Sequence, residues 1–440
     1  LNSGDLPATE DELVMPDIAE SAAPDISAPP LAKASAGYLA LISLANFGVS
    51  MAFIVPMSYS LAVRISQLEP GHEEVLGYVT GTAQFISIAA SPLIGVWSDR
   101  FRSRFGRRTP FMIGGALVGL LGLIGISFAP SVLLVGVGWV VALFGWAAAG
   151  QAIQNLQADR IPEEQRGRIS ALSGLAAQVA PVIGIGVAYA VSRSTFLVFV
   201  LPGLIGLALL VLFPLVKREG SSVGLVHNST VTVKALLASY LFSPRKYPDF
   251  GWNWLGRFVF FMGLYFNTTF GTFFAAQRLG LPVKEVAGTV AVIGMLGVVS
   301  AGLGALIGGF LSDRLRRRKL FVFLGALFFV AGGLTEAFAY SFPALVAGSL
   351  LMQGAIALFG AVDGAIVFAV LPDRAQAGRY LAVTQFSQRI PSAIAPLIAP
   401  LVIVLGANGA AKNYTALYLA GAALALLGSL IIVLKVKSVR

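Results

Sequence analysis

The sequence predicts an all-α membrane protein of twelve transmembrane helices, arranged as two pseudo-symmetric six-helix bundles. Of its 440 residues, 57% are hydrophobic and only 12% are charged, whereas a soluble domain keeps roughly a quarter of its residues charged. Apolar stretches long enough for an α-helix to cross the hydrocarbon of a bilayer recur from residue 37 onward. The second half of the chain repeats features of the first at an offset of about 210 residues.

The apolar stretches are separated by short polar or Pro- and Gly-containing turns. We expect helices and not an open sheet, because backbone groups in lipid must be hydrogen-bonded within the segment. The first six spans are expected at 37–62, 73–98, 109–128, 131–157, 168–191 and 194–216. The last six are expected at 249–276, 284–311, 319–340, 343–369, 380–404 and 413–435.

The segments outside the spans differ in kind. The first 36 residues are acidic and rich in Pro, Ala and Ser, which is typical of a disordered tail and not of a signal peptide. The apolar stretch 231–242 lies between the bundles and predicts either an interfacial helix or a plain linker. The expected organisation is a tail at 1–36, bundles at 37–216 and 249–435, a cytoplasmic linker at 217–248 and a cytoplasmic tail at 436–440.

Composition excludes several kinds of chemistry. The chain has no cysteine and two histidines, so disulfides, zinc sites and thiol chemistry are not expected. The formal net charge of +10 would suit nucleic acid, but no basic run lies in a soluble segment that could fold. No nucleotide-binding motif and no nucleophile–base pair is visible. We therefore expect no enzyme activity, no cofactor, no metal and no nucleic-acid partner.

Lysine and arginine indicate the orientation. Most of them lie in the loops after the even-numbered spans, above all in the clusters at 100–108 and 314–319. The opposite loops hold only Arg64, Arg193, Arg278, Lys284 and Lys412. Because cytoplasmic loops carry the excess of basic residues, we expect both termini in the cytoplasm and the chain in the inner (plasma) membrane.

The repeat is clearest in the loops. Gly95–Arg108, which contains Asp99, ends the second span, and Gly309–Lys319, which contains Asp313, ends the eighth. Pro162–Arg168 and Pro372–Arg379 follow spans four and ten. Ala62-Val-Arg64 and Ala276-Gln-Arg278 end spans one and seven. Parallel repeats predict a pseudo-two-fold axis along the membrane normal, with a path between the halves.

Residues 37–435 resemble the major facilitator superfamily, whose signature is a Gly-x-x-x-Asp-Arg-x-Gly-Arg-Arg loop. The extra residues in Ser98–Phe111 make this loop similar to that of sucrose–proton symporters and the glycoside–pentoside–hexuronide group, as do Asn155–Asp159 and Val362–Pro372. After Glu73 and Glu74 at its outer end, the second span carries no acidic residue, so a melibiose-type sodium site is not implied. Gly145-Trp146 stands where sucrose symporters are expected to have an acid.

Four ionisable residues lie at depth in the spans: Arg257, Glu336, Asp363 and Arg389. A charge at the bilayer centre costs about 2.5–3.5 kcal/mol, so each needs a partner, water or a function. Gln385, Gln388 and Arg389 share one helical face near the midplane, which suits ligands with hydroxyl or carboxylate groups. The alternative is that Arg389 pairs permanently with Asp363.

Asp363 is the predicted proton-coupling carboxylate, because burial raises a carboxyl pKa and a nearby arginine lowers it. The permanent pair with Arg389 remains its alternative role. We expect Glu336 to reach water near the outer end of span nine. Arg257 either faces the path or extends to the cytoplasm.

Other polar residues fall on helical faces at similar depth and predict a central polar cavity. Ser43, Asn46 and Ser50 share one face of span one, and Gln84, Ser87 and Ser91 share one face of span two. Phe258, Phe261 and Tyr265 could stack on sugar rings, although packing is the alternative for each. The predicted substrate-binding residues are Asn46, Gln84, Gln151, Asn155, Gln178, Arg257, Tyr265, Gln385, Gln388 and Arg389.

The superfamily resemblance implies a cytoplasmic gate. Asp99 would face Arg379 at the start of span eleven, and Asp313 would face Arg168 at span five. Such contacts between the halves exist only when the cytoplasmic side is closed. The predicted gate residues are Asp99, Arg100, Arg107, Arg108, Arg168, Asp313 and Arg379.

These observations predict a secondary transporter of a small polar solute, working by rocking of the two bundles. The resemblance implies a monomeric, proton-coupled sugar or glycoside symporter that functions in the lipid bilayer. One alternative is a proton-coupled exporter of amphipathic compounds, whose cavity needs fewer amides. The other is a non-transporting scaffold or sensor, which has no need of four deep charges.

Overall fold

The computed structural model describes residues 33–217, 219–223, 242–373, 376–405 and 411–439, and within this part the side chains of 92–100 are not described. Nearly all of the predicted acidic tail and nearly all of the apolar linker stretch 231–242 lie outside the described residues.

The first half of the chain forms six antiparallel spans. Its first span is continuous from Ala36 to Leu68 and contains a π-helical turn at Pro56–Ser60 between two α-helical parts. The helices of this half are α1 (Ala36–Val55), η2 (Pro56–Ser60), α2 (Leu61–Leu68), α3 (Val75–Arg100), α4 (Thr109–Phe128), α5 (Val132–Arg160), α6 (Glu163–Ala190) and α7 (Thr195–Val216).

The second half has the same succession of spans. Its first span is bent by 48° between two helices, and its second contains a π-helical turn at Ile307–Leu311. The helices of this half are α9 (Pro248–Thr269), α10 (Gly271–Leu279), η3 (Val283–Glu285), α11 (Ala287–Leu306), η4 (Ile307–Leu311), α12 (Ser312–Leu315), α13 (Arg318–Ala337), α14 (Phe342–Ala369), α15 (Ala377–Val404) and α16 (Tyr414–Lys435).

The described helices agree with the predicted spans. Ten are long and apolar enough to cross a membrane, and the bent pair α9–α10 makes an eleventh. The 26-residue α3, whose shorter apolar segment is Val75–Ser91, completes the predicted twelve. The largest difference lies at the first span, which continues to Leu68 and does not end near residue 62. The next largest lies at α6, which begins at Glu163 and not near residue 168. Glu163 and Glu164 stand in its first turn, where the helix dipole favours negative charge.

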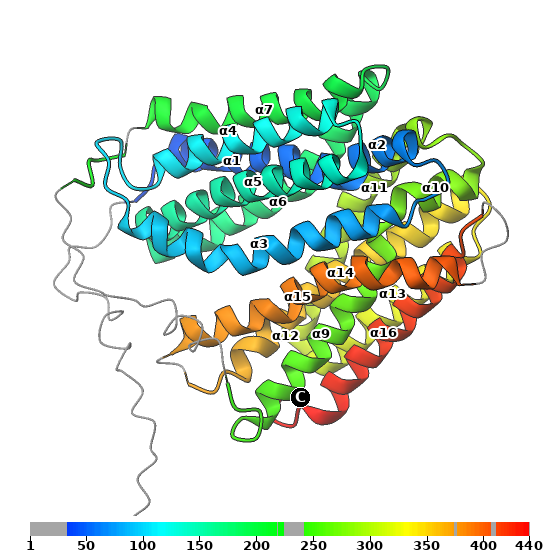
Figure 1. Cartoon of the computed structure of the whole chain (residues 1–440). Helices are drawn as coiled ribbons and strands as arrows, with labels where there is room; N and C mark the ends of the chain where they lie inside the picture. The colour runs from blue at the N-terminus through cyan, green and yellow to red at the C-terminus, as the bar shows by residue number, and fades with distance from the viewer. Residues whose placement is uncertain (1–32, 218, 224–241, 374–375, 406–410, 440) are drawn as a thin grey trace, which may run out of the picture.

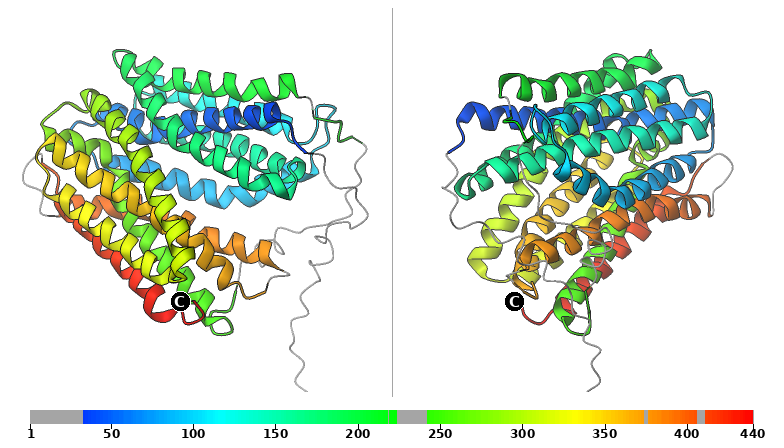
Figure 2. Two further views of the ribbon diagram at one scale, coloured as in Figure 1. Left: turned by 180° about the vertical axis from the view of Figure 1, so that it is seen from behind. Right: turned by 60° about the vertical axis from the view of Figure 1, so that its left-hand side comes forward.

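The two halves form separate bundles that meet at one end and diverge at the other (Figures 1 and 2). We call the end at which α1 begins and α16 ends the terminal face, and the other end the distal face. α3 of the first half runs beside α15 of the second (Figure 1). A second crossing is formed by α6 and α11. The bundles are therefore joined mainly through these two helix pairs.

The α3–α15 crossing depends on two glycines of α3. A Cβ atom at Gly77 would lie 2.3 Å from the carbonyl oxygen of Pro396, and one at Gly81 would lie 2.8 Å from that of Ala393. Both glycines lie in the distal half of α3. Without side chains there, the backbones approach closely, as small residues permit between membrane helices. The halves are therefore in tight contact on the distal side of the crossing.

The internal repeat extends to individual hydrogen bonds. Arg64 donates to the carbonyl oxygen of Ala129 at the end of α4, at 2.6 Å. Arg278 donates to that of Ala337 at the end of α13, at 2.7 Å. The last carbonyls of a helix have no partner within the helix, so the two arginines perform the same capping role in the two halves.

Candidate functional site

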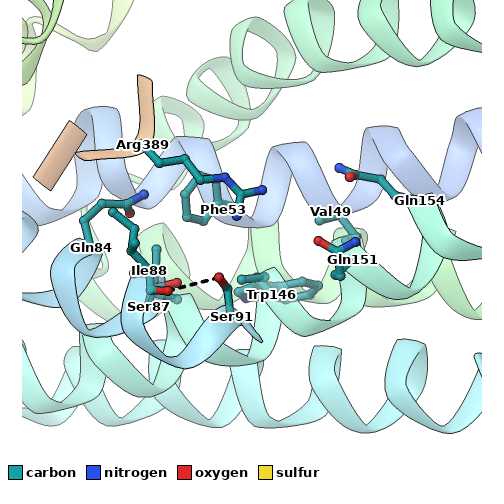
Figure 3. A pocket seen from close by; sticks show the side chains of 13 residues that line it. Val49, Phe53, Gln84, Ser87, Ile88, Ser91, Trp146, Gln151, Gln154 and Arg389 are labelled. Carbon is teal, nitrogen blue, oxygen red and sulfur yellow. Dashed lines mark hydrogen bonds between the residues drawn. The ribbon is translucent and has the colours of Figure 1, made fainter. Parts of the chain in front are cut away.

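A cavity of about 270 Å³ lies between the two halves and is lined by residues of both. The first half supplies side chains from α1, α3 and α5, and the second supplies Arg389 of α15 (Figure 3). The lining residues are Val49, Phe53, Gln84, Ser87, Ile88, Ser91, Leu143, Trp146, Ala147, Gly150, Gln151, Gln154 and Arg389.

Two helical faces supply the polar lining. On α3 these are Gln84, Ser87 and Ser91, the face that the sequence pattern singles out. On α5 they are Gln151 and Gln154, which lie one turn apart. Three amides and two hydroxyls thus line a space within the membrane-spanning part of the chain, where polar groups are costly without a ligand or water.

The apolar wall was not predicted. Trp146 and Phe53 line the cavity, whereas the sequence pattern indicated Trp146 only as the replacement for an expected acid. The signal was present, since the α5 face of Gln151 and Gln154 continues at helical spacing through Gly150 and Ala147 to Trp146. Trp146 is 1% exposed, and its indole packs over Gly119. The buried indole of Trp146 therefore forms a well-packed part of the cavity wall.

Arg389 extends from α15 toward the polar faces of the first half (Figure 3). Its side chain is exposed. Among the residues that the structure describes, no ion pair or hydrogen bond to its guanidinium is found. The Cα of Arg389 is about 18 Å along α15 from its start at Ala377, at 1.5 Å per residue. The cavity thus contains a cation near mid-membrane depth.

Asp363 of α14 is paired with Arg257 of α9, deep inside the second half. Both residues are 5% exposed. Arg257 also donates from Nε to the hydroxyl of Ser387 on α15, at 2.9 Å, and lies over the ring of Phe261. Asp363 Oδ1 is buried and has no hydrogen-bond partner among the described residues. This cluster joins α9, α14 and α15. Its residue on α15, Ser387, lies two positions before Arg389 in the sequence.

The pair corrects two expectations. Asp363 does not pair with Arg389, because α15 presents Ser387 to the second half's interior and Arg389 to the cavity. Arg257 neither lines the cavity nor extends to the terminal face, since it is held in the interior by Asp363. The approach of α9, α14 and α15 that produces this pairing is a property of packing between helices.

Glu336 was expected to reach water, and that expectation is wrong. It is 4% exposed and accepts a hydrogen bond from Ser349 of α14. Tyr418 of α16 is a second hydrogen-bonding partner. Its position near the end of α13 is as predicted, but α14 and α16 cover it. The cluster lies away from the lining of the cavity.

The other predicted binding residues have various surroundings. Gln388 lies within hydrogen-bonding reach of Tyr265, and Gln385 is exposed on the same face of α15 as Arg389. Gln151 donates to Asn155 at 3.0 Å, next to the cavity. Asn46 donates to Ser173 of α6 at 3.2 Å, away from the lining.

Three further predicted residues lie outside the lining of this cavity. Gln178 of α6 is exposed. Phe258 stacks on Trp254, with ring centroids 5.6 Å apart. Phe261 packs edge-on against Phe359. For the two phenylalanines the packing alternative therefore applies.

The ion pairs described for Asp159 and Asp313 at the terminal face each lie within one half. Arg107 and Arg108 contact Asp159 at 2.9 and 3.0 Å. Asp313 lies 3.7 Å from Arg318 and is 69% exposed at its side chain, so the structure does not bring it to Arg168, which is exposed.

Of the remaining predicted gate residues, the structure describes the side chain of Arg379. Arg379 donates to Gln376 in the turn before α15, at 3.0 Å. The side chains of Asp99 and Arg100 lie outside the described part of the chain.

Contacts with Glu219 explain the conformation of the signature loop before α4. Gly106 has φ +89°, and a Cβ there would lie 2.3 Å from the carboxyl group of Glu219. Glu219 accepts from the backbone N–H groups of Arg108 and Thr109, at 2.9 and 3.0 Å, and so caps the start of α4. In the corresponding loop of the second half, Arg316 ends α12 with φ 52°. The second loop therefore also contains a left-handed residue, which is not a glycine.

The distal face is closed by polar contacts between the halves. Tyr59 of η2 donates to the carbonyl oxygen of Lys284 at 2.8 Å. Lys412, just before α16, forms an ion pair with Glu74 at 2.7 Å. Tyr414 donates to Glu73. With the α3–α15 crossing, these contacts separate the cavity from the distal face.

Comparison with known proteins agrees with this architecture. The family model described as Major Facilitator Superfamily matches residues 36–304, more than half of the chain. The human Proton-associated sugar transporter A is 34% identical over 77 residues, which are 18% of this chain and 10% of that protein. Sucrose transport protein SUT4 of Oryza sativa subsp. indica is 35% identical over 69 residues, 14% of this chain and 11% of that protein. The matches thus span about a tenth of these relatives' length.

Solved structures share the fold over nearly the whole chain. A mutant of the nucleoside transporter NupG has a TM-score of 0.74 at 12% identity, covering 91% of this chain and 100% of that one. The D-xylose-proton symporter has a TM-score of 0.68 at 17% identity, covering 92% and 99%. At such identities the likeness concerns the fold alone. With the matched family model, it shows that this chain belongs to the major facilitator superfamily and is a multi-pass membrane transporter, not an enzyme.

Proposed function

We propose that this transporter is a proton-coupled symporter of a sugar or glycoside. The observation that carries the proposal is the cavity between the halves, whose lining combines three amides, two serine hydroxyls and a guanidinium with the rings of Trp146 and Phe53. Hydroxyl-rich solutes need amide donors and acceptors, and the C–H faces of a sugar ring pack on aromatic rings. The partial similarity to sugar transporters supports the same substrate class.

Asp363 is the proposed site of proton coupling. Its buried Oδ1 is free among the described residues, whereas Oδ2 is held by Arg257. A proton on Asp363 cancels its charge and weakens its hold on Arg257, which also contacts Ser387 of α15. Because α15 carries Arg389 into the cavity, protonation and solute binding act on the same helix. Proton uptake can thus be linked to movement of the second half relative to the first.

The proposed cycle is rocking of residues 37–216 against 249–435 in a monomer. From the excess of basic residues in the loops of the terminal face, we infer that this face is cytoplasmic and that the membrane is the inner one. The structure then corresponds to an inward-facing state. The outward-facing state would bring Asp313 toward Arg168 and Asp99 toward Arg379.

An exporter of amphipathic compounds is the weaker candidate. Its cavity would have a mostly apolar lining, whereas both helical faces that line this one carry amides or hydroxyls. Competition between candidate sugars and amphipathic dyes for binding to the purified protein separates the two proposals. Displacement by dyes and not by any sugar would favour export.

The substitution Asp363→Asn tests the coupling. We expect it to abolish accumulation of the sugar against a gradient while counterflow exchange continues, because the amide keeps the shape of the site but takes up no proton. The sugar is first identified by its stabilisation of the purified protein against thermal unfolding. Uptake is then measured in proteoliposomes with an imposed pH gradient.

Two variants keep this test interpretable. Asp363→Asn leaves Arg257 buried without its partner, which costs about 3–5 kcal/mol of stability, and the double variant Arg257→Gln/Asp363→Asn removes both charges. The control is Glu336→Gln. Glu336 is another buried carboxyl group of the second half; it is 4% exposed and does not line the cavity. This variant should accumulate sugar normally. Uphill transport by Asp363→Asn at the wild-type level would remove Asp363 from the mechanism.

A further inference from the structure

The first span of each half is interrupted near its distal end. In span one the helix contains the π-helical turn η2, in which the N–H of Leu61 donates to the carbonyl oxygen of Pro56. In span seven the helix is bent by 48° between α9 and α10, which meet at Phe270. The π-turn η2 contacts α10 across the interface of the two halves. The two interruptions therefore lie against each other at the distal face.

Proline determines where span one is interrupted. Pro56 has no backbone N–H, so the carbonyl oxygen of Ala52 lacks the donor that an α-helix would supply. Prolines and π-turns are among the usual causes of an irregular helix, and single π-turns are frequent at functional sites. The interruption is therefore a property of the sequence of span one.

One hydrogen bond joins equivalent residues of the two halves. Thr272, at the start of α10, donates from its hydroxyl to the carbonyl oxygen of Ser58 in η2, and the two residues are 214 positions apart. Arg64 and Arg278, which cap helices in the same way in the two halves, have the same separation in the sequence. Two equivalent points related by a two-fold rotation can touch only beside the rotation axis. The bond therefore lies beside the pseudo-two-fold axis.

The hydroxyl of Thr272 is directed across the interface and not along its own helix. Thr268 and Thr269 of the same span donate to carbonyl oxygens four residues earlier, at 3.1 and 2.6 Å, as threonines in helices commonly do. Thr272 is 5% exposed and donates to the other half. Tyr59, also in η2, donates to the carbonyl oxygen of Lys284 at 2.8 Å. The π-turn is thus bonded to the second half at two consecutive residues.

The π-turn makes the carbonyl group of Ser58 available to the other half. In a regular α-helix this oxygen would accept the N–H of Ala62, four residues later. A π-turn displaces the hydrogen bonds of the helix by one residue, so a carbonyl group can turn toward a partner outside the helix. Ser58 has such a partner in Thr272.

We propose that Thr272 is a positioning residue for closure of the distal face, and that η2 is shaped to receive its hydroxyl. The bond from Thr272 to Ser58 holds the halves together beside the axis in this state. It breaks in each transport cycle when the halves separate at the distal face. This role concerns the movement of the two halves, so it does not depend on which solute the protein carries.

The direct test removes the hydroxyl alone. Spin labels on cysteines at Glu69, after α2, and Leu281, after α10, report the distance between the halves in the full-length protein in lipid nanodiscs. Thr272→Val should raise the ratio of distally open to closed molecules by about 2- to 10-fold, because one hydrogen bond of the closed state is lost. Thr272→Ser keeps the hydroxyl and should restore the wild-type distances.

Thr269→Val is the matched control, because its hydroxyl donates to Tyr265 of its own helix. It should leave the distances unchanged. Tyr59→Phe removes the neighbouring bond between η2 and the second half and should also raise the open fraction, so the role of η2 is tested by an independent variant. Thermal unfolding of each purified variant shows whether it is folded.

Pro56→Ala tests whether Thr272 acts through the π-turn. The alanine restores the missing N–H and favours a regular helix, in which the carbonyl oxygen of Ser58 bonds to Ala62. The open fraction should therefore rise. Adding Thr272→Val should then have little further effect, because the hydroxyl has already lost its acceptor. Pro214→Ala replaces a proline inside α7, near the terminal face, and should leave the distances unchanged.

Each outcome decides for or against the proposal. Unchanged distances in Thr272→Val, or an equal change in Thr269→Val, would overturn the role of Thr272. A change that Thr272→Ser does not reverse would show that the shape of the side chain matters and not its hydroxyl. If the ratios measured for Thr272→Val and Pro56→Ala multiply in the double variant, η2 is not the element through which Thr272 acts.

Discussion

The two ends of the molecule solve the problem of charged residues differently. At the distal face Lys412 and Glu74 pair across the two halves. At the terminal face Asp159 pairs with Arg107 and Arg108, and Asp313 with Arg318, within one half each. Contacts that cross the interface depend on the relative position of the bundles, and contacts within a bundle do not. The distal contacts therefore select this state, whereas the described ion pairs of the terminal face are compatible with either.

The largest expected effect comes from Gly77→Leu. The side chain would meet the backbone of α15, where even a Cβ lies 2.3 Å from an oxygen, so the distal face cannot close as it does here. Overpacking of this kind costs about 1–3 kcal/mol, which shifts a balanced two-state equilibrium by about 5- to 150-fold. Uptake in proteoliposomes should fall accordingly.

Gly288→Leu is the matched control. Gly288 lies in the first turn of α11 at the same face, and a Cβ there meets no atom within 4 Å. It should transport at the wild-type rate. Wild-type transport by Gly77→Leu would show that close contact of α3 and α15 is not part of the cycle.

A smaller effect on closure of the distal face is expected from the adjacent residues Glu73 and Glu74, which contact Tyr414 and Lys412 of the other half. Burial is the largest influence on Glu73 and raises its pKa, against the hydrogen bond from Tyr414 and the charge of Lys412. Burial also acts to raise the pKa of Glu74, but its hydrogen bonds with Lys412, the backbone and His72 outweigh this, and the pKa is lowered. The two carboxyl groups therefore respond to pH in opposite directions.

The sign of each pH effect on closure of the distal face follows from the linkage between proton binding and conformation. Glu73 favours distal closure below its ordinary pKa, and this contribution is lost as the pH rises through the raised value. Glu74 favours closure above its ordinary pKa, and its contribution is lost as the pH falls through the lowered value. At neutral pH, Glu74→Gln should open the distal face and Glu73→Gln should close it further, each by about 0.2–1 kcal/mol.

Spin labels measure these shifts directly, because the chain has no native cysteine. Cysteines at Glu69 and Leu281 place one label on each half at the distal face. The mean distance between the two labels should increase in Glu74→Gln. In Glu73→Gln it should decrease, or the distribution of distances should narrow. Shifts in the same direction for both variants would contradict the assigned roles.

The smallest effect on this state is expected from Asp313→Asn. Its pair with Arg318 is exposed and 3.7 Å long, so thermal stability should change by less than about 1 kcal/mol. Transport should fall more than stability does, if Asp313 meets Arg168 in the outward-facing state. Equal transport by variant and wild type would remove Asp313 from the proposed gate.

Much of the fold could be predicted because it depends on local properties of the chain. Apolar length predicted the spans, and the repeated loops predicted two related halves. Helical spacing alone placed Gln84, Ser87 and Ser91 on one face, and that face lines the cavity. These inferences require only the geometry of a single helix.

The pairing of deep charges could not be predicted in the same way. Arg389 was the one partner considered for Asp363, whereas the observed pairing with Arg257 depends on how α9, α14 and α15 pack. Glu336 was placed correctly along α13, but its burial results from α14 and α16. Depth follows from position in a span, whereas the neighbours of a side chain follow from tertiary packing.

The most direct test of the account is the accessibility of the cavity from each side of the membrane. A single cysteine in place of Ser91, which lines the cavity, is treated with a membrane-impermeant maleimide in vesicles of either orientation. We predict fast labelling from the terminal face in the otherwise wild-type protein, and a shift toward labelling from the distal face when Gly77→Leu is added. Fast labelling of the wild-type background from the distal face alone, unchanged by Gly77→Leu, would contradict a single cavity opened in turn to the two sides.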